Sequence, residues 1–217
     1  MTDGNGSGRL RQHRYSMSFE PKFPSTGRIE AFSDGVIAII ITIMVLDLRP
    51  PGHEISHNTL GHLAGYLAPK LTVYVLSFII VARIWVSHHQ LLYAASHTTP
   101  RLMWLNLLLL FFMSLIPFAT GYLGEDPARP LAVATYSVVM FLTASTFTWM
   151  RYYVVTQLRD KEHAGHLHPR LMRRSLLGMA FYGLAIPCAY VSVYVSYALF
   201  IVVPVIAFLN DMRPRDT

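Results

Sequence analysis

Six apolar runs, each about long enough to cross the hydrocarbon core of a bilayer, constrain this chain more than any other feature. They cover approximately residues 29–48, 66–86, 102–122, 131–150, 175–189 and 192–209. Hydrophobic residues make up 53% of the 217 positions and charged residues only 14%, which departs from an ordinary soluble domain. The sequence therefore predicts an all-α membrane protein with six transmembrane helices per chain.

The basic residues are distributed unevenly between the two ends of these runs. On the expected topology, 14 Lys and Arg residues flank the end that carries both termini, and the other end has Arg49, Lys70 and Arg129. Because flanking Lys and Arg are retained in the cytoplasm, both termini are expected there. This asymmetry accounts for the formal charge of +6, with membrane lipid as the expected contact and no nucleic acid as a partner.

The domain organisation follows from the same pattern. Residues 1–24 are polar and basic and are expected to form a disordered cytoplasmic tail. Residues 25–210 hold the six runs as one transmembrane domain, and residues 211–217 are expected to form a short cytoplasmic C-terminal tail.

The chain carries no pattern typical of catalysis or cofactor binding. It has one cysteine, Cys188, no glycine-rich phosphate loop, and no nucleophile beside a base at motif spacing. Histidines in the loops are usually solvated unless a fixed scaffold holds them. Those of this chain are His53, His57, His62, His163, His166 and His168. We therefore expect no metal site, no cofactor and no enzymatic activity.

The first apolar run, in "GRIEAFSDGVIAIIITIMVLDL", combines an apolar stripe with carboxylates at its two ends. At 100° per residue, Ile39, Ile43 and Leu46 share one face with Thr42 at its edge, whereas Asp34 points more than a third of a turn away. The stripe fits helix packing as well as the lining of a pore. Residue types and spacing alone leave both interpretations open.

Asp34 needs a partner on another helix, because an uncompensated carboxylate near the membrane is unfavourable. The candidates are Arg83, His88 and His89 near the end of the second run, and Asn106 near the start of the third. Such a cluster either ties the helices together or forms a proton relay.

A more specific indication comes from the motif Arg28, three residues, then Phe32, Ser33 and Asp34. With "WVSHH" in the second run and "LNLLLLFFMSLIPF" in the third, it resembles the endolysosomal potassium channel family (transmembrane protein 175) and its bacterial relatives. In that family, animal members carry two six-helix repeats, whereas bacterial members carry one and form tetramers whose first helices line a central pore. The resemblance implies a homotetramer in a bacterial plasma membrane.

The resemblance also implies roles for individual residues. Ile39 would form the narrowest hydrophobic ring, with Thr42 and Leu46 further along the pore, and Ile43 shares their face. Asp47 would lie at the outer mouth. A polar network between helices would close the cytoplasmic end, and its expected members are Arg28, Phe32, Ser33, Asp34, Trp85, His89 and Asn106. Arg83 is added to this network from its position alone.

The expected function is passive potassium flux through a channel with modest selectivity over sodium, set by a hydrophobic constriction in place of a carbonyl filter. The permeant potassium ion is then the only bound species expected. The alternative is a proton-coupled transporter or proton-conducting channel that uses Asp34 and the His88/His89 pair. A membrane scaffold without transport is a third possibility.

Overall fold

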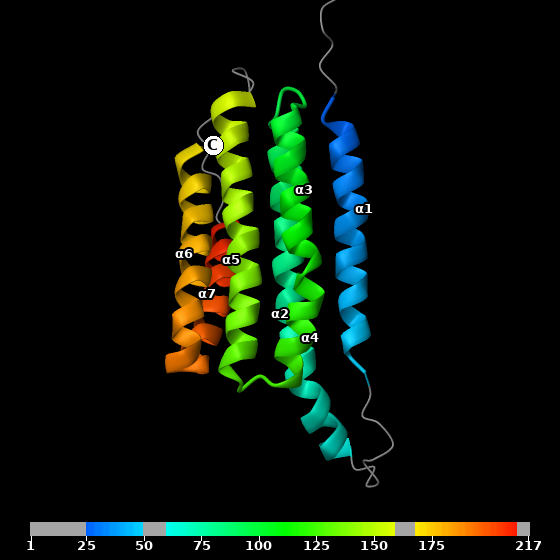
Figure 1. Ribbon diagram of the computed structural model, residues 1–217, viewed down its shortest axis with the longest axis vertical. Helices are drawn as coiled ribbons and strands as arrows, with labels where there is room; N and C mark the ends of the chain where they lie inside the picture. The colour runs from blue at the N-terminus through cyan, green and yellow to red at the C-terminus, as the bar shows by residue number, and fades with distance from the viewer. Residues whose placement is uncertain (1–24, 50–59, 159–167, 212–217) are drawn as a thin grey trace, which may run out of the picture.

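The computed structural model describes residues 25–49, 60–158 and 168–211, which form helices that run side by side along one axis (Figure 1). The first two helices are α1, Gly27–Ile43, which continues as the 3-10 helix Met44–Asp47, and α2, Leu60–Tyr93. They are followed by α3, Pro100–Ser114, α4, Ile116–Glu125, and α5, Pro130–Tyr153, with a π-helical extension at Val154–Leu158. The last two are α6, His168–Val191, and α7, Val193–Asp211.

The helices confirm an all-helical membrane architecture. Five segments of the described chain are long and apolar enough to cross a bilayer: Gly27–Asp47, Leu63–Tyr93, Pro100–Glu125, Pro130–Leu158 and Leu171–Val191. The sixth predicted run corresponds to α7, in which the apolar stretch is shorter and covers Val193–Val202. The tail predicted at residues 1–24 lies outside the described residues. Of the tail predicted at 211–217, residues 212–217 lie outside them as well.

The third predicted run is two helices. Pro117 lies in the first turn of α4, directly after the break at Leu115. Proline has no N–H, and its ring clashes with the carbonyl four residues earlier, so α-helical hydrogen bonding is interrupted there. The Leu115 N–H instead donates to the Phe112 carbonyl at 3.2 Å. The two helices together still form one span, Pro100–Glu125.

The buried core is centred on α5, which packs against α3, α4 and α6. Side chains such as Val133, Tyr136, Met140 and Met150 are buried along its whole length. By contrast, α1 lies at the edge of the bundle and packs on α2, α3 and α4 (Figure 1). One face of α1 is therefore left without packing inside the chain.

Candidate functional site

The face of α1 that the bundle leaves uncovered carries the predicted apolar stripe. Ile39 is 57% exposed, Ile43 46% and Leu46 64%, although all three are large apolar side chains. The opposite face is buried against the neighbouring helices through Ser33, Ile37, Ile40 and Met44. The helix is thus two-faced, and a second protein surface, a pore or lipid must cover the exposed side.

Thr42 lies on the same exposed side of α1. Its hydroxyl Oγ1 lies 3.0 Å from the carbonyl oxygens of Ala38 and Ile39, so its proton is directed into its own helix. The oxygen lone pairs remain free to accept. An exposed threonine held this way presents an acceptor, which suits a partly dehydrated cation.

Asp47 ends the 3-10 turn that follows α1, and its carboxylate packs against Gly121 of α4. A Cβ atom at position 121 would lie 2.9 Å from the Asp47 carboxylate, so any larger residue there would push this carboxylate aside. The charges of Arg49, Lys70 and Glu125 act on this half-buried carboxylate. Asp47 therefore lies between α1 and α4, at the end of the bundle opposite the start of α1, and its role at an outer mouth stays a prediction.

At the N-terminal end of α1, a buried polar junction links three helices. The Asn106 amide on α3 donates to Ser33 Oγ on α1 at 2.9 Å, and Ser33 Oγ donates to the Ile29 carbonyl at 2.8 Å. Asn106 Oδ1 in turn lies 2.7 Å from Nε2 of His88 on α2. A carbonyl oxygen can only accept, so this network places a proton on His88 Nε2. His88 Nδ1 is buried and has no partner among the described residues.

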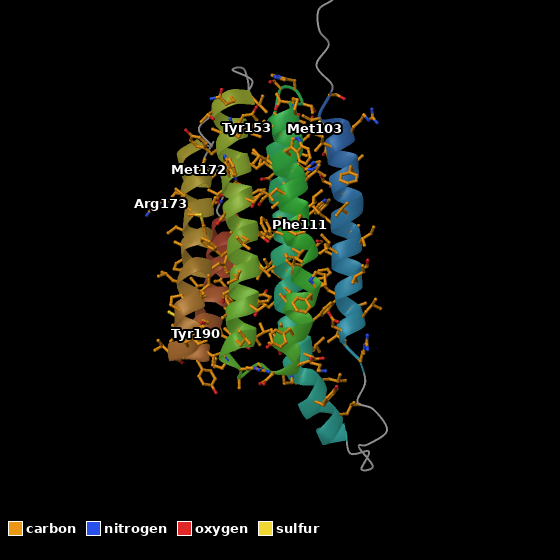
Figure 2. The ribbon with its side chains drawn as sticks, viewed as in Figure 1. Met103, Phe111, Tyr153, Met172, Arg173 and Tyr190 are labelled. Carbon is orange, nitrogen blue, oxygen red and sulfur yellow. The ribbon has the colours of Figure 1, made fainter. Side chains whose placement is uncertain are left out.

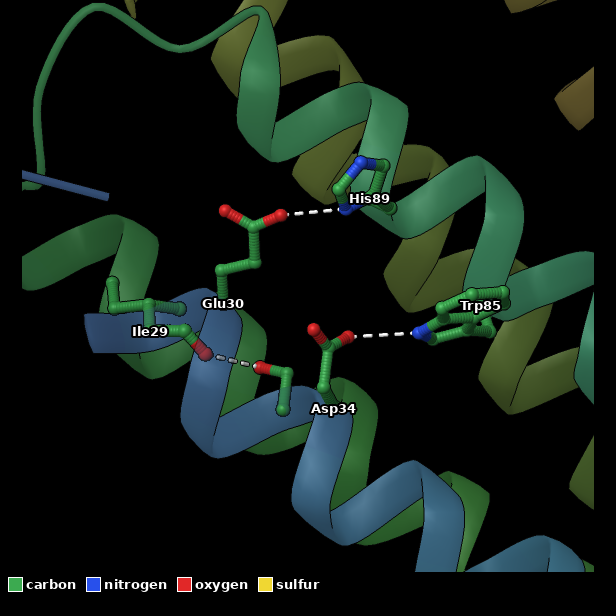
Figure 3. Close-up of polar contacts among 6 residues, drawn as sticks. Ile29, Glu30, Asp34, Trp85 and His89 are labelled. Atoms are coloured by element: carbon green, nitrogen blue, oxygen red, sulfur yellow. Dashed lines mark hydrogen bonds and ion pairs between the residues drawn. The ribbon is translucent and has the colours of Figure 1, made fainter. Parts of the chain in front are cut away.

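Two further contacts join α1 to α2 beside this junction (Figure 3). Trp85 Nε1 donates to Asp34 Oδ1 at 2.8 Å, and His89 Nδ1 contacts Glu30 Oε1. Glu30 and Asp34 are four residues apart on α1, and their partners on α2, His89 and Trp85, are also four residues apart but in the reverse order. This is the pairing that antiparallel helices produce, so the two contacts fix both the register and the rotation of α1.

Arg83, the network member predicted from its position alone, lies on a different side of α2 from Trp85. Arg83 and Trp85 are two residues apart on α2 and thus point to nearly opposite faces, since each helical residue turns 100°. Trp85 faces Asp34, whereas the charge of Arg83 acts on Arg151 of α5 and Tyr182 of α6. Arg83 thus belongs to the other side of α2.

Other predicted members of the network lie apart from the junction. Phe32 is 54% exposed on α1, and Arg28 is exposed in its first turn with no contact recorded among the described residues. Glu30, by contrast, was not predicted as a member. Its spacing of four residues from Asp34, matched by Trp85 and His89, is the signal that could have revealed it.

Sequence reasoning also missed a second buried polar cluster deeper in the bundle. Ser77 of α2 lies 3.0 Å from the hydroxyl of Tyr136 on α5, and Thr120 of α4 donates to Ser77 Oγ at 2.9 Å. All three side chains are buried, so each hydroxyl needs a partner. Isolated hydroxyl residues within apolar runs gave no spacing signal for this cluster.

Among the described residues, no group of three His, Cys, Asp or Glu side chains could hold a metal ion. His53, His57, His163 and His166 lie outside the described residues, and the side chains of His62 and His168 are not described either. The expectation that the chain binds no metal or cofactor stays a prediction.

The fold and this site define a class: a multi-pass helical membrane protein in which polar contacts hold an edge helix whose other face is apolar and exposed. Comparisons with known proteins narrow the class. Residues 28–117 match the family model described as endosomal/lysosomal potassium channel TMEM175.

Bacterial relatives that match over most of their length support the same family. A potassium channel of Chryseobacterium sp. (strain P1-3) is 32% identical over 188 residues, which cover 86% of this chain and 94% of that protein. A potassium channel of Streptomyces collinus is 35% identical over 186 residues, covering 80% and 86%. A crystal structure is known for a homologue of the lysosomal potassium-selective channel TMEM175 from Chamaesiphon minutus. It superposes with a TM-score of 0.76 at 28% identity, and the match covers 87% of this chain and 98% of that one. The chain belongs to the TMEM175 family of ion channels.

Animal relatives are named proton channels rather than potassium channels. The mouse endosomal/lysosomal proton channel TMEM175 is 32% identical over 133 residues, which are 57% of this chain and 27% of that protein. The similarity to the mouse protein thus concerns only a part of a longer polypeptide.

Proposed function

We propose that the chain forms a potassium-selective cation channel, a homotetramer in which four copies of α1 line a central pore. The observation that carries the proposal is the exposed face of α1, where large apolar side chains and Thr42 are left uncovered by their own chain. Four such faces around one axis would bury that surface and surround a narrow pathway. The bacterial relatives named potassium channels support potassium as the permeant ion.

Selectivity in this pore would come from the cost of dehydration. Four Ile39 side chains offer an ion no ligands, so an ion that passes must shed part of its hydration shell. Potassium holds its water less tightly than sodium and crosses at a lower cost. Thr42, one turn further along, presents the hydroxyl acceptors that replace some of the lost water. Neither the Ile39 ring nor the Thr42 hydroxyls surround the ion with a rigid set of ligands, so we expect modest selectivity for potassium over sodium.

The polar junction has a separate role in this proposal. Asp34 is bonded to Trp85, and Ser33 to Asn106, on the side of α1 that faces its own chain. These groups are positioned to hold α1 in place while its other face contacts the ions. We therefore assign Ser33, Asp34, Trp85, His89 and Asn106 to assembly and not to ion coordination.

A second candidate function is proton conduction or proton-coupled transport through Asp34, His88 and His89. It is favoured by the animal relatives, which are named proton channels. Against it, the Asp34 carboxylate and His88 Nε2 already make hydrogen bonds within the junction, away from the exposed stripe.

The test is a reversal potential measured on purified protein in planar bilayers, with potassium on one side and sodium on the other. A reversal potential displaced toward the potassium equilibrium supports the channel, and a displacement that follows a pH gradient supports proton conduction. A current no larger than that of protein-free bilayers would refute both.

We further propose that the protein lies in a bacterial plasma membrane with both termini in the cytoplasm. The end of the bundle where α1 begins carries Arg101, Arg151, Arg173 and Arg174, whereas the opposite end carries Arg49, Lys70 and Arg129. This distribution favours the cytoplasm for the first end.

A further inference from the structure

A groove of about 310 Å³ lies between α3 and α5, close to the end of the bundle where α1 begins. It is lined by Arg101, Trp104, Leu105 and Leu108 of α3 and by Trp149 of α5. We call it the α3–α5 groove. The proposed pore and the polar junction use none of its side chains, so its composition requires a separate explanation.

The walls of the groove are two exposed indoles. Trp104 is 73% exposed and Trp149 50% exposed, whereas Leu105, which also lines the groove, is buried. Trp104 lies about one turn after the start of α3, near the depth where tryptophans gather in membrane proteins, and Trp149 lies about one turn before α5 passes into its π-helical extension. The groove thus offers an apolar slot bounded by rings that tolerate both lipid chains and water.

The charge at the mouth of the groove is held in place. The Arg101 guanidinium lies 4.8 Å from the ring centre of Tyr153 on α5, a cation–π contact. The Tyr153 hydroxyl is bonded to Thr99 Oγ1 at 3.0 Å, and Thr99 caps α3 by accepting from the Leu102 N–H. Figure 2 labels Tyr153 near the end of α5, beside α3.

Among the described residues, the contact that the Arg101 guanidinium makes is with the ring of Tyr153 and not with a carboxylate. A fixed guanidinium at the membrane interface, above an apolar slot, is complementary to a phosphate that carries acyl chains. Arg101, Leu105 and Leu108 follow one face of α3 over about 10 Å, so the slot continues from the charged mouth toward the membrane interior.

We propose that the α3–α5 groove binds one anionic phospholipid of the cytoplasmic leaflet, with its phosphate on Arg101 and an acyl chain between Trp104 and Trp149. The proposal is independent of ion selectivity and uses the proposed orientation only to choose the leaflet. A free phosphate ion has no acyl chain to contact the indoles. A zwitterionic lipid would bring its own positive charge close to Arg101, which is unfavourable.

The chain's own fluorescence provides the test, because it has three tryptophans. Full-length protein is placed in phosphatidylcholine vesicles that contain a small, equal fraction of brominated phosphatidylglycerol or brominated phosphatidylcholine. We expect stronger quenching by the phosphatidylglycerol, and the variant with both Trp104→Phe and Trp149→Phe defines the background from Trp85. Equal quenching by the two lipids would overturn the proposal, and so would quenching by neither, which would indicate that a second copy covers the groove.

A matched pair of charge variants identifies the residue responsible. Arg101→Gln should weaken the preference for phosphatidylglycerol roughly tenfold, the size expected for losing a charge-assisted contact. Arg173→Gln removes the same charge at the same end of the bundle, from an exposed residue of α6 that points away from the groove (Figure 2), and should leave the preference intact. An equal effect of both variants would contradict a specific site. The comparison of the two lipids on unaltered protein stands even if Arg101→Gln does not fold.

Discussion

The indole of Trp85 donates to the carboxylate of Asp34 at 2.8 Å, on the side of α1 turned away from its exposed stripe. Asp34 and Ile39 are five residues apart, so their side chains diverge by about 140° around the helix. Any contact that fixes Asp34 therefore also determines the direction in which Ile39 points. The junction and the stripe are coupled through the rotation of one helix.

Removing the indole donor should loosen this helix without altering the ions it meets. Trp85→Phe keeps an aromatic ring but leaves the half-buried Asp34 carboxylate without its donor, which costs about 1–3 kcal/mol. We expect a lower melting temperature in detergent and an unchanged permeability ratio in the channels that survive. The control is Tyr93→Phe, which removes the polar atom of a 79% exposed aromatic residue on the same helix. A stable variant with altered selectivity would contradict the assignment of Asp34 to assembly.

The second polar cluster predicts a loss of stability away from α1. Tyr136→Phe deletes the hydroxyl that lies 3.0 Å from Ser77 in the core, and we expect it to lower the stability by about 1 kcal/mol. The measurement is thermal unfolding in detergent, with Tyr194→Phe, 80% exposed on α7, as the control. If the contact is real, Ser77→Ala added to Tyr136→Phe should have less than an additive effect. Full additivity would mean that the two hydroxyls do not interact.

How far the sequence predicts this structure can be judged from α1. Its two faces follow from 100° periodicity, because residues such as Ile37 and Ile39 separate cleanly between buried and exposed positions. Asp47 could not be placed in the same way. The last turn narrows to a 3-10 helix, which advances 120° per residue, and the carboxylate turns onto Gly121.

Contacts between helices were harder to predict than faces within one helix. The family motif correctly brought Ser33, Asp34, Trp85 and Asn106 together, since a resemblance carries information about tertiary contacts. Arg83 was placed by proximity in sequence alone, and periodicity cannot say how α2 is rotated against its neighbours. The break at Pro117 was missed because its flanks are uniformly apolar, although proline chemistry explains it afterwards.

The proposed orientation predicts which turns can be labelled from outside the cell. In a Cys188→Ser background, Ala128→Cys in the exposed turn between α4 and α5 should react with an impermeant thiol reagent in intact cells. Ser25→Cys, exposed just before α1, should react only after the cells are permeabilised. The reverse pattern would invert the topology and place the α3–α5 groove in the outer leaflet.

Thr42→Val tests whether the hydroxyl contributes to ion preference. The variant keeps the shape of the side chain and deletes the acceptor, and losing about 1 kcal/mol of ion stabilisation would lower the potassium-to-sodium permeability ratio roughly fivefold. Thr72→Val on α2 is the control, because its hydroxyl makes the same bond to the carbonyl four residues earlier. An unchanged ratio in Thr42→Val would leave selectivity to the apolar ring alone.

The apolar ring is tested by Ile39→Asn, which places an amide from each subunit where ions would otherwise meet only hydrocarbon. Sodium has the tighter hydration shell and gains more from these ligands, so we expect a larger current and a sodium permeability that rises roughly fivefold relative to potassium. Ile39→Leu, which keeps the same carbon count and offers no ligand, should retain the original ratio. The readout is the reversal potential under the potassium/sodium gradient. If Ile39→Asn assembles normally and keeps the original reversal potential, the constriction lies elsewhere, and Leu46, 64% exposed on the same face, becomes the next position to test.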